Sequence, residues 1–452
     1  MSGQKVLVVG GGVAGQTAAL RCRDAGCDVA LLEARPRLGG AAASFRRGDL
    51  VVDTGQHVIL RCYAAYRALL RRLGREASFE LPRGFRVPMV EPGGRAWTLR
   101  GRRLPAPAHL APALLGHRGL GPAQRAAAAR TALALRKLDP EDPELDRSSF
   151  GQWLAARREP ERNVRALWGL LTVAALNAEP HDASLALAAR VFRTGVLDTA
   201  SGGDIGVPRE PLGRIHDVAA RATLEAAGVT VRTRAKALDL RRCGTGLRLT
   251  TRDESGTGEC DADAVVVAVP HAAAGKLLAG LEIPQAREWP RLSAAPIVNV
   301  HVVYDRPVTD RTPVAAIGSP VQWVFDRTAV SGLADGQYLA LSLSAAQSYV
   351  DARTRDLREL FLPALADVFP TAGTARVRDF FVTREPRATF LQAPGTRALR
   401  PPAATPVPGV VLAGAWTDTG WPDTLEGAVT SGERAAKAAT STGASRCVEV
   451  RA

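Results

Sequence analysis

The chain has 452 residues, of which 46% are apolar and 23% charged, the composition of an ordinary globular protein with room for two or three domains. No run of about 18 uncharged apolar residues occurs, so we expect no transmembrane helix. No basic, apolar leader precedes the first predicted strand, and six scattered cysteines have neither CxxC nor zinc spacing. We therefore expect a cytoplasmic protein without disulfides or a metal centre.

The excess positive charge lies in one segment. The net charge of the chain is +14, and residues 61–137 contain 16 Lys or Arg but only three Glu, a local net charge of +13. The segment lacks a nucleic-acid-binding motif and has few aromatic residues to stack on bases, so we expect no nucleic-acid partner. Two interpretations stay open: a solvated arginine-rich face, or a peripheral contact with anionic lipid headgroups at the inner face of a membrane.

The first predicted unit is a strand, a glycine turn, a helix and a second strand across residues 5–35. Gly10, Gly12 and Gly15 form GxGxxG directly after the first strand, and Glu33 ends the second. This spacing predicts a tight turn at Gly10, close approach of a pyrophosphate at Gly12, and close helix–strand packing at Gly15. Glu33 is suited to hydrogen-bond a ribose diol, so the unit predicts a dinucleotide site.

The stretch VVDTGQHVIL, residues 51–60, sets an acid, a glycine, a glutamine and a histidine between two apolar runs. A plain connection does not need that mixture, so we expect the turn to have a function. Farther along, alternating residues predict strands at 228–240, 296–306 and 320–327. Helical spacing is found at 122–138, 149–158, 162–176, 183–193 and 349–368.

The end of the chain returns to the first type of unit. A proline-rich linker, LRPPAATPVPG, precedes the strand VVLAGAW and the closing helix LEGAVTSGERAAKAA. The pattern predicts an α/β protein with a discontinuous nucleotide-binding domain and a substrate domain of helices and an antiparallel sheet. We assign residues 1–82, 212–285 and 405–445 to the first domain, 83–211 and 286–404 to the second, and 446–452 to a flexible tail.

Three stretches carry a family resemblance: DTGQHVILRCYAAYRALLRRLG, PIVNVHVVYDRPV with SPVQWVFDR, and AGAWTDTGWPDTLEGAVTSG. Together with EARPRLGG they resemble the flavin amine oxidase/phytoene desaturase superfamily, and more specifically the squalene-associated FAD-dependent desaturases, now understood as hydroxysqualene dehydroxylases. The resemblance implies an FAD-binding Rossmann-like domain of the two-dinucleotide-binding type with a discontinuous α+β substrate domain, as in amine oxidases. It also implies non-covalent FAD and reductive dehydroxylation of hydroxysqualene, a long isoprenoid, to squalene.

The resemblance also implies the residues that bind the cofactor. Asp53 and Gly55 match the D-x-G position of the family, and Gly55 would let the backbone pass close to the isoalloxazine ring. The start of the last helix would point amides at a ring carbonyl. Two departures are Ala41, where the superfamily often has Arg, and Ala415, where many members have an acid. The full predicted set is Gly10, Gly12, Val13, Ala14, Gly15, Glu33, Ala34, Arg37, Gly39, Gly40, Gly55, Gln56, His57, Val231, Gly414, Ala415, Leu425, Glu426 and Ala428.

The implied reaction makes three demands. Hydroxide leaves poorly, so a general acid should protonate it. An allylic cation needs a dry, electron-rich wall, which aromatic faces supply. The flavin N5 must lie close to the reacting carbon. The candidates are His57, Asp418, Trp416, Trp421, Gln322 and Trp323.

Each candidate has a structural alternative. His57 either donates the proton or holds its loop by a hydrogen bond. Asp423 fits an N-cap as well as a functional role, and the tryptophans fit ordinary packing. Trp323 and Gln322 lie on opposite faces of their strand, and the sequence leaves open which face lines the pocket. Asn299 and His301 are expected to be satisfied sheet positions.

Two other functions stay open. A carotenoid or phytoene-type desaturase would keep the fold and reverse the electron flow. A non-catalytic escort protein for prenyl lipids would keep the architecture without chemistry, although the intact glycine motif argues against it. The oligomeric state, the reductant and the stereochemistry of hydride delivery are not indicated by the sequence.

Overall fold

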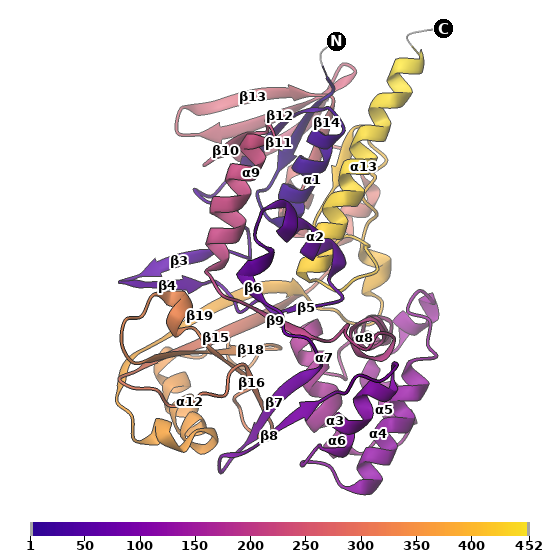
Figure 1. Cartoon of the computed structure of the whole chain (residues 1–452). Helices are drawn as coiled ribbons and strands as arrows, with labels where there is room; N and C mark the ends of the chain where they lie inside the picture. The colour runs from indigo at the N-terminus through magenta and orange to yellow at the C-terminus, as the bar shows by residue number, and fades with distance from the viewer. Residues whose placement is uncertain (1–2, 450–452) are drawn as a thin grey trace.

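A five-stranded parallel sheet forms the nucleotide-binding part of the molecule (Figure 1). The computed structural model describes residues 3–449, with side chains described up to residue 441. Every pairing in this sheet is parallel, as expected for a Rossmann-like unit. In order across the sheet the strands are β10 (Thr230–Thr233), β2 (Asp28–Glu33), β1 (Lys5–Val9), β14 (Ala264–Val267) and β20 (Val410–Leu412).

Both faces of this sheet are buried, because its strands are apolar at successive positions. Val6 and Val8 of β1 face one core, and Leu7 and Val9 face the other. The first core is covered by α1 (Val13–Asp24), α2 (Ala64–Arg72), α9 (Ala220–Ala226) and α13 (Leu425–Glu449). The second is covered by α10 (His271–Leu277) and an antiparallel sheet of β11 (Lys236–Cys243), β12 (Gly246–Asp253) and β13 (Gly256–Ala262).

The second large element is a seven-stranded sheet. One face packs on α12 (Thr354–Val368) through a valine- and leucine-rich core. We predicted an antiparallel sheet, but it is mixed, because β16 and β7 pair in parallel. In order the strands are β19 (Val377–Phe390), β15 (Ala294–Tyr304), β18 (Gln337–Leu343), β17 (Trp323–Asp326), β16 (Val314–Ala316), β7 (Arg86–Glu91) and β8 (Arg95–Arg100).

A helical segment packs beside β7 and β8 (Figure 1). Its predicted helices are confirmed with shifted ends, and a π-helical turn at Val164–Trp168 interrupts the one expected at 162–176. The segment is not wholly helical, because the β7–β8 hairpin lies within residues 83–211. The helices are α3 (Ala111–Leu115), α4 (Pro122–Leu135), α5 (Phe150–Ala156), α6 (Glu161–Asn163), α7 (Gly169–Leu176) and α8 (Leu185–Phe192).

Short strands connect these parts. The hairpin of β3 (Ser44–Arg47) and β4 (Leu50–Asp53) packs against β15, β18 and β19 of the large sheet. β9 (Ile205–Pro208) pairs with β5 (Ile59–Leu60) and β6 (Phe79–Glu80). The α/β fold class is as predicted, and the domain boundaries given above remain our proposal. The predicted tail at 446–452 begins within α13, and its last three residues lie outside the described residues.

None of the helices in the described part of the chain is long and apolar enough to cross a membrane.

Candidate functional site

The glycine loop after β1 has the geometry that its spacing predicts. Gly10 has a φ of +111°, which L side chains rarely adopt. A Cβ at Gly15 would lie 1.9 Å from the carbonyl oxygen of Gly10, so α1 can pack this closely only with glycine there. A Cβ at Gly12 would meet only the Cα of Gly40, at 3.9 Å. Space therefore remains beside Gly12 at the start of α1, where a pyrophosphate is expected.

Gly39 and Gly40 close this cradle from the other side. The amide of Gly39 donates to the carbonyl oxygen of Gly11 over 2.9 Å, which joins the two glycine turns. Glu33 is half-buried beside them, and its carboxylate accepts from the amides of Gly11 at 2.7 Å and Arg35 at 2.8 Å. Arg37 is half-buried, and its Nε has no partner among the described residues.

Four further predicted positions lie around the cradle, and each is either apolar and at least half-buried or exposed. Val13 and Ala14 are buried in the first turn of α1 and supply backbone only. Ala34 is exposed at the end of β2. Val231 pairs with Leu31 in the parallel sheet and packs, half-buried, on the first core. They are placed where a nucleotide could be contacted by backbone atoms.

The start of α13 extends beyond the start of α1. Gly432 packs against Ala14, where a Cβ would lie 2.4 Å from the Ala14 carbonyl oxygen, and the carbonyl of Ala439 accepts from Gln4 at the other end of α1. The two helices therefore run parallel, and the seven residues before Gly432 project about 10 Å past α1. Such an offset suits a ligand whose pyrophosphate lies at α1 and whose ring lies at α13.

Some polar groups at the start of α13 are used within the protein, and others are free to bind a ligand. The carboxylate of Glu426 accepts from the amides of Ala65 and Tyr66, so its side chain caps α2 and is not free for a ligand. The Ala428 amide is bonded within the helix to Thr424. Thr424, and not Asp423, receives the capping hydrogen bond, from Gly427 at 3.2 Å. The amides of Leu425 and Glu426 remain as the donors available to a ring.

Asp53 is the last residue of β4 and has a structural role. Its buried carboxylate accepts from the Ser44 hydroxyl at 2.6 Å, from the Leu212 amide at 3.0 Å and from Arg327 at 2.5 Å. The position thus fixes where the turn begins. Gln56 lies three residues after Asp53, and its side-chain Nε2 has no partner among the described residues.

His57 is held by its own loop. Its Nδ1 lies 3.1 Å from the carbonyl oxygen of Gly55, which can only accept, so Nδ1 carries the proton. Burial is the main cause that lowers the pKa of His57. A neutral ring with its proton on Nδ1 presents Nε2 as an acceptor. The geometry therefore favours loop support and acceptance of a hydrogen bond over proton donation.

The loop at 414–424 is organised by Arg400, which sequence reasoning placed in a linker. The Nη2 of this buried guanidinium donates to the carbonyl oxygens of Thr417 at 2.6 Å, Trp421 at 2.8 Å and Ala415 at 3.0 Å. Burial lowers the pKa of Arg400, and Asp418 and other carboxylates oppose that shift. A lone arginine before Pro-Pro carries no sequence pattern that could have revealed this role.

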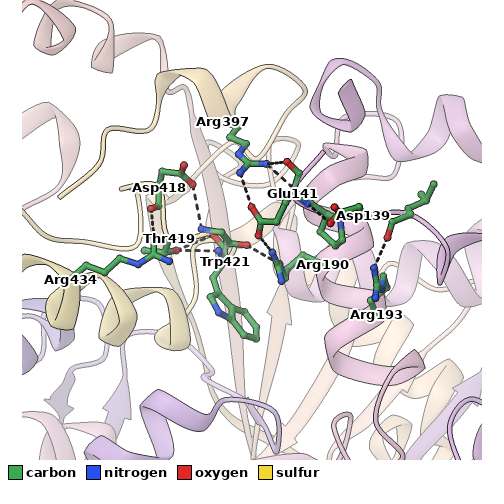
Figure 2. A network of polar contacts seen from close by, with 12 residues as sticks. Asp139, Glu141, Arg190, Arg193, Arg397, Asp418, Thr419, Trp421 and Arg434 are labelled. Atoms are coloured by element: carbon green, nitrogen blue, oxygen red, sulfur yellow. Dashed lines mark hydrogen bonds and ion pairs between the residues drawn. The ribbon is translucent and has the colours of Figure 1, made fainter. Parts of the chain in front are cut away.

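Asp418 and Trp421 point in different directions from this loop (Figure 2). The Asp418 carboxylate accepts from the Gly420 amide at 3.3 Å and lines a small pocket with Asp146 and Arg397 of neighbouring segments. The Trp421 indole packs on the first core, edge-to-face with Tyr63 at 5.8 Å. His57 and Asp418 share no contact among the described residues.

Two predicted catalytic residues have structural roles instead. Trp416 is buried in the second core, its Nε1 donates to the Val269 carbonyl oxygen at 3.0 Å, and its ring contacts Trp289. Its indole also lies so close to Gly414 that a Cβ there would approach within 2.6 Å. Gln322 uses both ends of its amide on the Ser344 backbone, at 3.0 and 2.9 Å. Neither side chain is free to act on a substrate.

One row of side chains crosses all seven strands on the face opposite α12. The neighbouring positions, such as Val300 and Val324, belong to the α12 core, which fixes the face of the row. Asn299 from this row reaches toward the carbonyl oxygen of Thr54, at 3.5 Å. Three members of the row are polar and four are apolar. In register order they are Thr383, Asn299, Ser342, Trp323, Ala315, Met89 and Trp97.

This row settles which face of β17 meets the nucleotide-binding segments. Trp323 and Phe325 lie on it, and their rings stack at 6.4 Å. The Oδ1 of buried Asn299 and the Nε1 of Trp323 have no partner among the described residues. Unsatisfied buried polar atoms are costly, so they mark a place where a ligand or water completes the contacts.

The donors and spaces fit a flavin dinucleotide. The donors are the amides at the Gly12–Gly40 cradle and at the start of α13 and the unpartnered nitrogens of Arg37 and Gln56, and Glu33 lies beside the cradle as an acceptor. Within the described part of the chain, no group of three His, Cys, Asp or Glu side chains is arranged to hold a metal ion.

Comparison with known proteins gives the family. Residues 13–440 match the family described as flavin containing amine oxidoreductase. A hydroxysqualene dehydroxylase of Rhodopseudomonas palustris is 30% identical over 446 residues, which cover 95% of this chain and 97% of the relative. A zeta-carotene desaturase of Synechocystis sp. is 25% identical over 483 residues, 96% of each chain. The solved structure of cyclohexylamine oxidase from Brevibacterium oxydans has a TM-score of 0.68 to this chain. The two chains are 19% identical, and the match covers 97% of this chain and 99% of that one.

The last likeness shows the fold, and the others show the cofactor class. The non-catalytic escort interpretation is set aside, because the matched family consists of oxidoreductases. The chain therefore belongs to the flavin-containing amine oxidoreductase family and is an FAD-dependent oxidoreductase.

Proposed function

We propose that this enzyme reductively dehydroxylates hydroxysqualene to squalene. The substrate carbon loses its C–O bond and gains a C–H bond, and the hydroxyl leaves as water after taking up a proton. When bound, reduced FAD supplies the hydride and ends oxidised. The relative from Rhodopseudomonas palustris is named for this reaction, and it matches almost the whole chain.

The observation that carries the proposal is the mixed row across the large sheet. Its polar part, with Asn299 and Ser342, lies beside the loop at 54–57, where a hydroxyl and a flavin edge would meet. Its apolar part continues through Trp323 and Met89 into a cluster with Leu99 and Ala113. A long hydrocarbon with one hydroxyl has the same distribution of polarity.

Two groups are assigned roles toward the hydroxyl. The neutral His57 accepts a hydrogen bond through Nε2 and orients the C–O bond. Asp423 is proposed as the acid, because burial raises its pKa to about 6, so a protonated carboxyl is accessible near neutral pH. Asp423 lies immediately before α13, where its Oδ2 accepts from the Phe390 amide at 3.2 Å. Trp421 and Trp323 are proposed to face the allylic cation.

A desaturase acting on a carotenoid is the second candidate. The match to zeta-carotene desaturase favours it, and the same apolar row would accept a polyene. Desaturation removes hydride from the substrate, so it needs oxidised flavin and a final electron acceptor, whereas dehydroxylation needs reduced flavin.

The test is product analysis with the holoenzyme. Anaerobic, photoreduced enzyme is mixed with hydroxysqualene and extracted for squalene, and oxidised enzyme with a quinone is mixed with phytoene or zeta-carotene. Squalene formed only with reduced flavin supports the proposal. A longer conjugated polyene in the second reaction, without squalene in the first, replaces it by the desaturase.

The acid assignment is tested with matched variants. Asp423→Asn should lower kcat by about 100-fold or more, whereas Asp418→Asn should stay within about threefold of wild type. Since the acid must be protonated, wild-type kcat should fall as pH rises through about 6. Equal losses in both variants, or a flat pH profile, would remove Asp423 from this role. His57→Ala should raise the KM for the substrate and leave the pH at which kcat falls unchanged.

A further inference from the structure

The basic segment 61–137 is not one uniform surface. Six of its arginines form ion pairs with carboxylates, and these pairs connect structural elements. Arg61, for example, holds the buried Asp204 at 2.7 Å and also donates to the carbonyl oxygens of Leu81 and Pro82. The six are Arg61, Arg67, Arg72, Arg75, Arg95 and Arg136. Fewer positive charges are therefore available to a partner than the sequence count of this segment indicates.

Five of the remaining arginines meet at one end of the β7–β8 hairpin. β7 begins where β8 ends, and the Gly101 amide donates to the Phe85 carbonyl oxygen over 2.9 Å, which joins the two flanking loops. All five side chains are exposed, and no ion pair is recorded for them within the described residues. We call this set the arginine cluster: Arg83, Arg86, Arg100, Arg102 and Arg103.

The positive charge of the arginine cluster is not neutralised by acids in the same segment. Arg86 and Arg100 are directly opposite in the ladder, an arrangement of like charges that destabilises a sheet. The only acid between residues 81 and 110 is Glu91, at the far end of the hairpin, where it pairs with Arg95. An external anion would remove the repulsion that the chain itself leaves in place.

An exposed apolar side chain lies next to the arginine cluster. Leu104 follows Arg103 directly and is 44% exposed. On the other face of the same hairpin, Val87 and Leu99 are buried in the apolar cluster that contains Met89 and Trp323. The arginine cluster and the apolar part of the row therefore belong to the same hairpin, three positions apart along its strands.

We propose that the arginine cluster and Leu104 dock the enzyme on the anionic surface of a phospholipid bilayer, at the end of the hairpin whose opposite face belongs to the buried apolar cluster. The arginines contact lipid phosphates, and Leu104 enters the headgroup region. The arginine cluster contains no aromatic side chain that could stack on bases, which disfavours a single-stranded nucleic acid as the partner. The membrane as a source of substrate rests on the proposed function, whereas the docking itself does not.

The experiment is co-sedimentation of the holoenzyme with phosphatidylcholine vesicles, with and without phosphatidylglycerol. The triple variant Arg100→Gln, Arg102→Gln, Arg103→Gln is compared with a control that removes the same charge elsewhere. The control is Arg242→Gln, Arg287→Gln, Arg353→Gln, three exposed arginines without a recorded ion pair in the described residues. Flavin absorbance of each purified variant confirms that it is folded.

Wild type and the control should bind vesicles that contain phosphatidylglycerol, more weakly as salt is raised, and the cluster variant should bind about tenfold less or lower still. Leu104→Ser should weaken binding at high salt, where insertion dominates. Equal binding by both triple variants, equal binding to both vesicle types, or a cluster-dependent shift only with duplex DNA or RNA would overturn the proposal. Vesicle binding without squalene formation would fail the proposed function and leave the docking in place.

Discussion

Arg327 and Asp53 form a buried ion pair between residues 274 positions apart, with Nη2 and Oδ2 separated by 2.5 Å. The side chains are 7% and 1% exposed. Asp53 ends β4 beside the glycine turns, and Arg327 lies between β17 of the large sheet and α11 (Thr328–Ser331). The pair therefore sets the position of the sheet relative to the loop that carries Gln56 and His57.

Removing one charge from this pair should destabilise the protein more than removing a charge from an exposed pair that joins the same parts. Asp53→Asn leaves Arg327 buried without its partner, which costs about 3–5 kcal/mol. The control is Asp379→Asn, because Asp379 (38% exposed) pairs with Arg47 (46% exposed) of the same hairpin, and an exposed pair of this type is worth about 0–1 kcal/mol. The measurement is the free energy of unfolding in urea, followed by tryptophan fluorescence. Equal losses in the two variants would contradict a special role for the buried pair.

Gly12→Ala should yield a folded protein that has lost most of its flavin. Gly12 has ordinary dihedral angles, φ −72° and ψ 176°, and a Cβ there meets the protein only at 3.9 Å. The methyl group instead fills the space that a pyrophosphate needs, so we expect flavin content to fall by about tenfold. The control is Gly258→Ala, where a Cβ meets nothing within 4 Å on an exposed strand. Full flavin content in Gly12→Ala, measured by absorbance after denaturation, would place the pyrophosphate elsewhere.

The elements predicted best are those whose signal is local. The βαβ unit follows from hydrophobic period and glycine spacing, which act within about 30 residues. The β7–β8 hairpin was missed because Pro88 and the arginines hide the alternation of Val87 and Met89 on one face. Its pairing with β16 joins residues more than 200 positions apart, a relationship that no local pattern contains.

The site shows the same division between local and distant information. Gly10, Gly12 and Gly15 could be assigned because backbone geometry demands glycine there. Trp416 looked like a cavity wall, yet it completes a core with Trp289, a partner 127 positions away. The role of Arg400 could not be predicted, because its acceptors are main-chain carbonyl oxygens. Every residue has such an oxygen, so the sequence does not single out the partners.

His216 should make stability depend on pH below about 6.5. Burial lowers its pKa from 6.5 to about 3, and its Nε2 lies 2.8 Å from the Tyr66 hydroxyl. Above about pH 6.5 neither state binds the proton and the residue has no effect. Below it the unfolded chain is protonated while the buried ring is not, so stability falls by about 1.4 kcal/mol per pH unit from this group. Asp423, whose pKa is raised to about 6, acts in the opposite direction as pH falls through that value.

The contribution of His216 is isolated by comparing slopes. Unfolding free energies of wild type and His216→Gln are measured at several pH values from about 7 to about 5, and the variant should show a slope shallower by about one proton. His181→Gln serves as the control, because the His181 side chain is 75% exposed. Identical slopes in wild type and His216→Gln would mean that His216 is protonated in the folded protein.

Trp323 and Trp289 should separate catalysis from stability. Both indole Nε1 atoms lack a partner among the described residues, but Trp323 faces the mixed row and Trp289 is buried at 1% exposure in the second core. Trp323→Leu should lower kcat/KM for hydroxysqualene by about 10- to 100-fold, because it removes contact with the hydrocarbon near the reacting carbon. Trp289→Leu should instead lower the free energy of unfolding by about 2–4 kcal/mol and leave kcat/KM of the folded enzyme near wild type. Steady-state squalene formation and urea unfolding are measured on both variants. If Trp323→Leu lost stability and kept its kcat/KM, the hydrocarbon would have to lie outside the row that runs from Asn299 to Trp97.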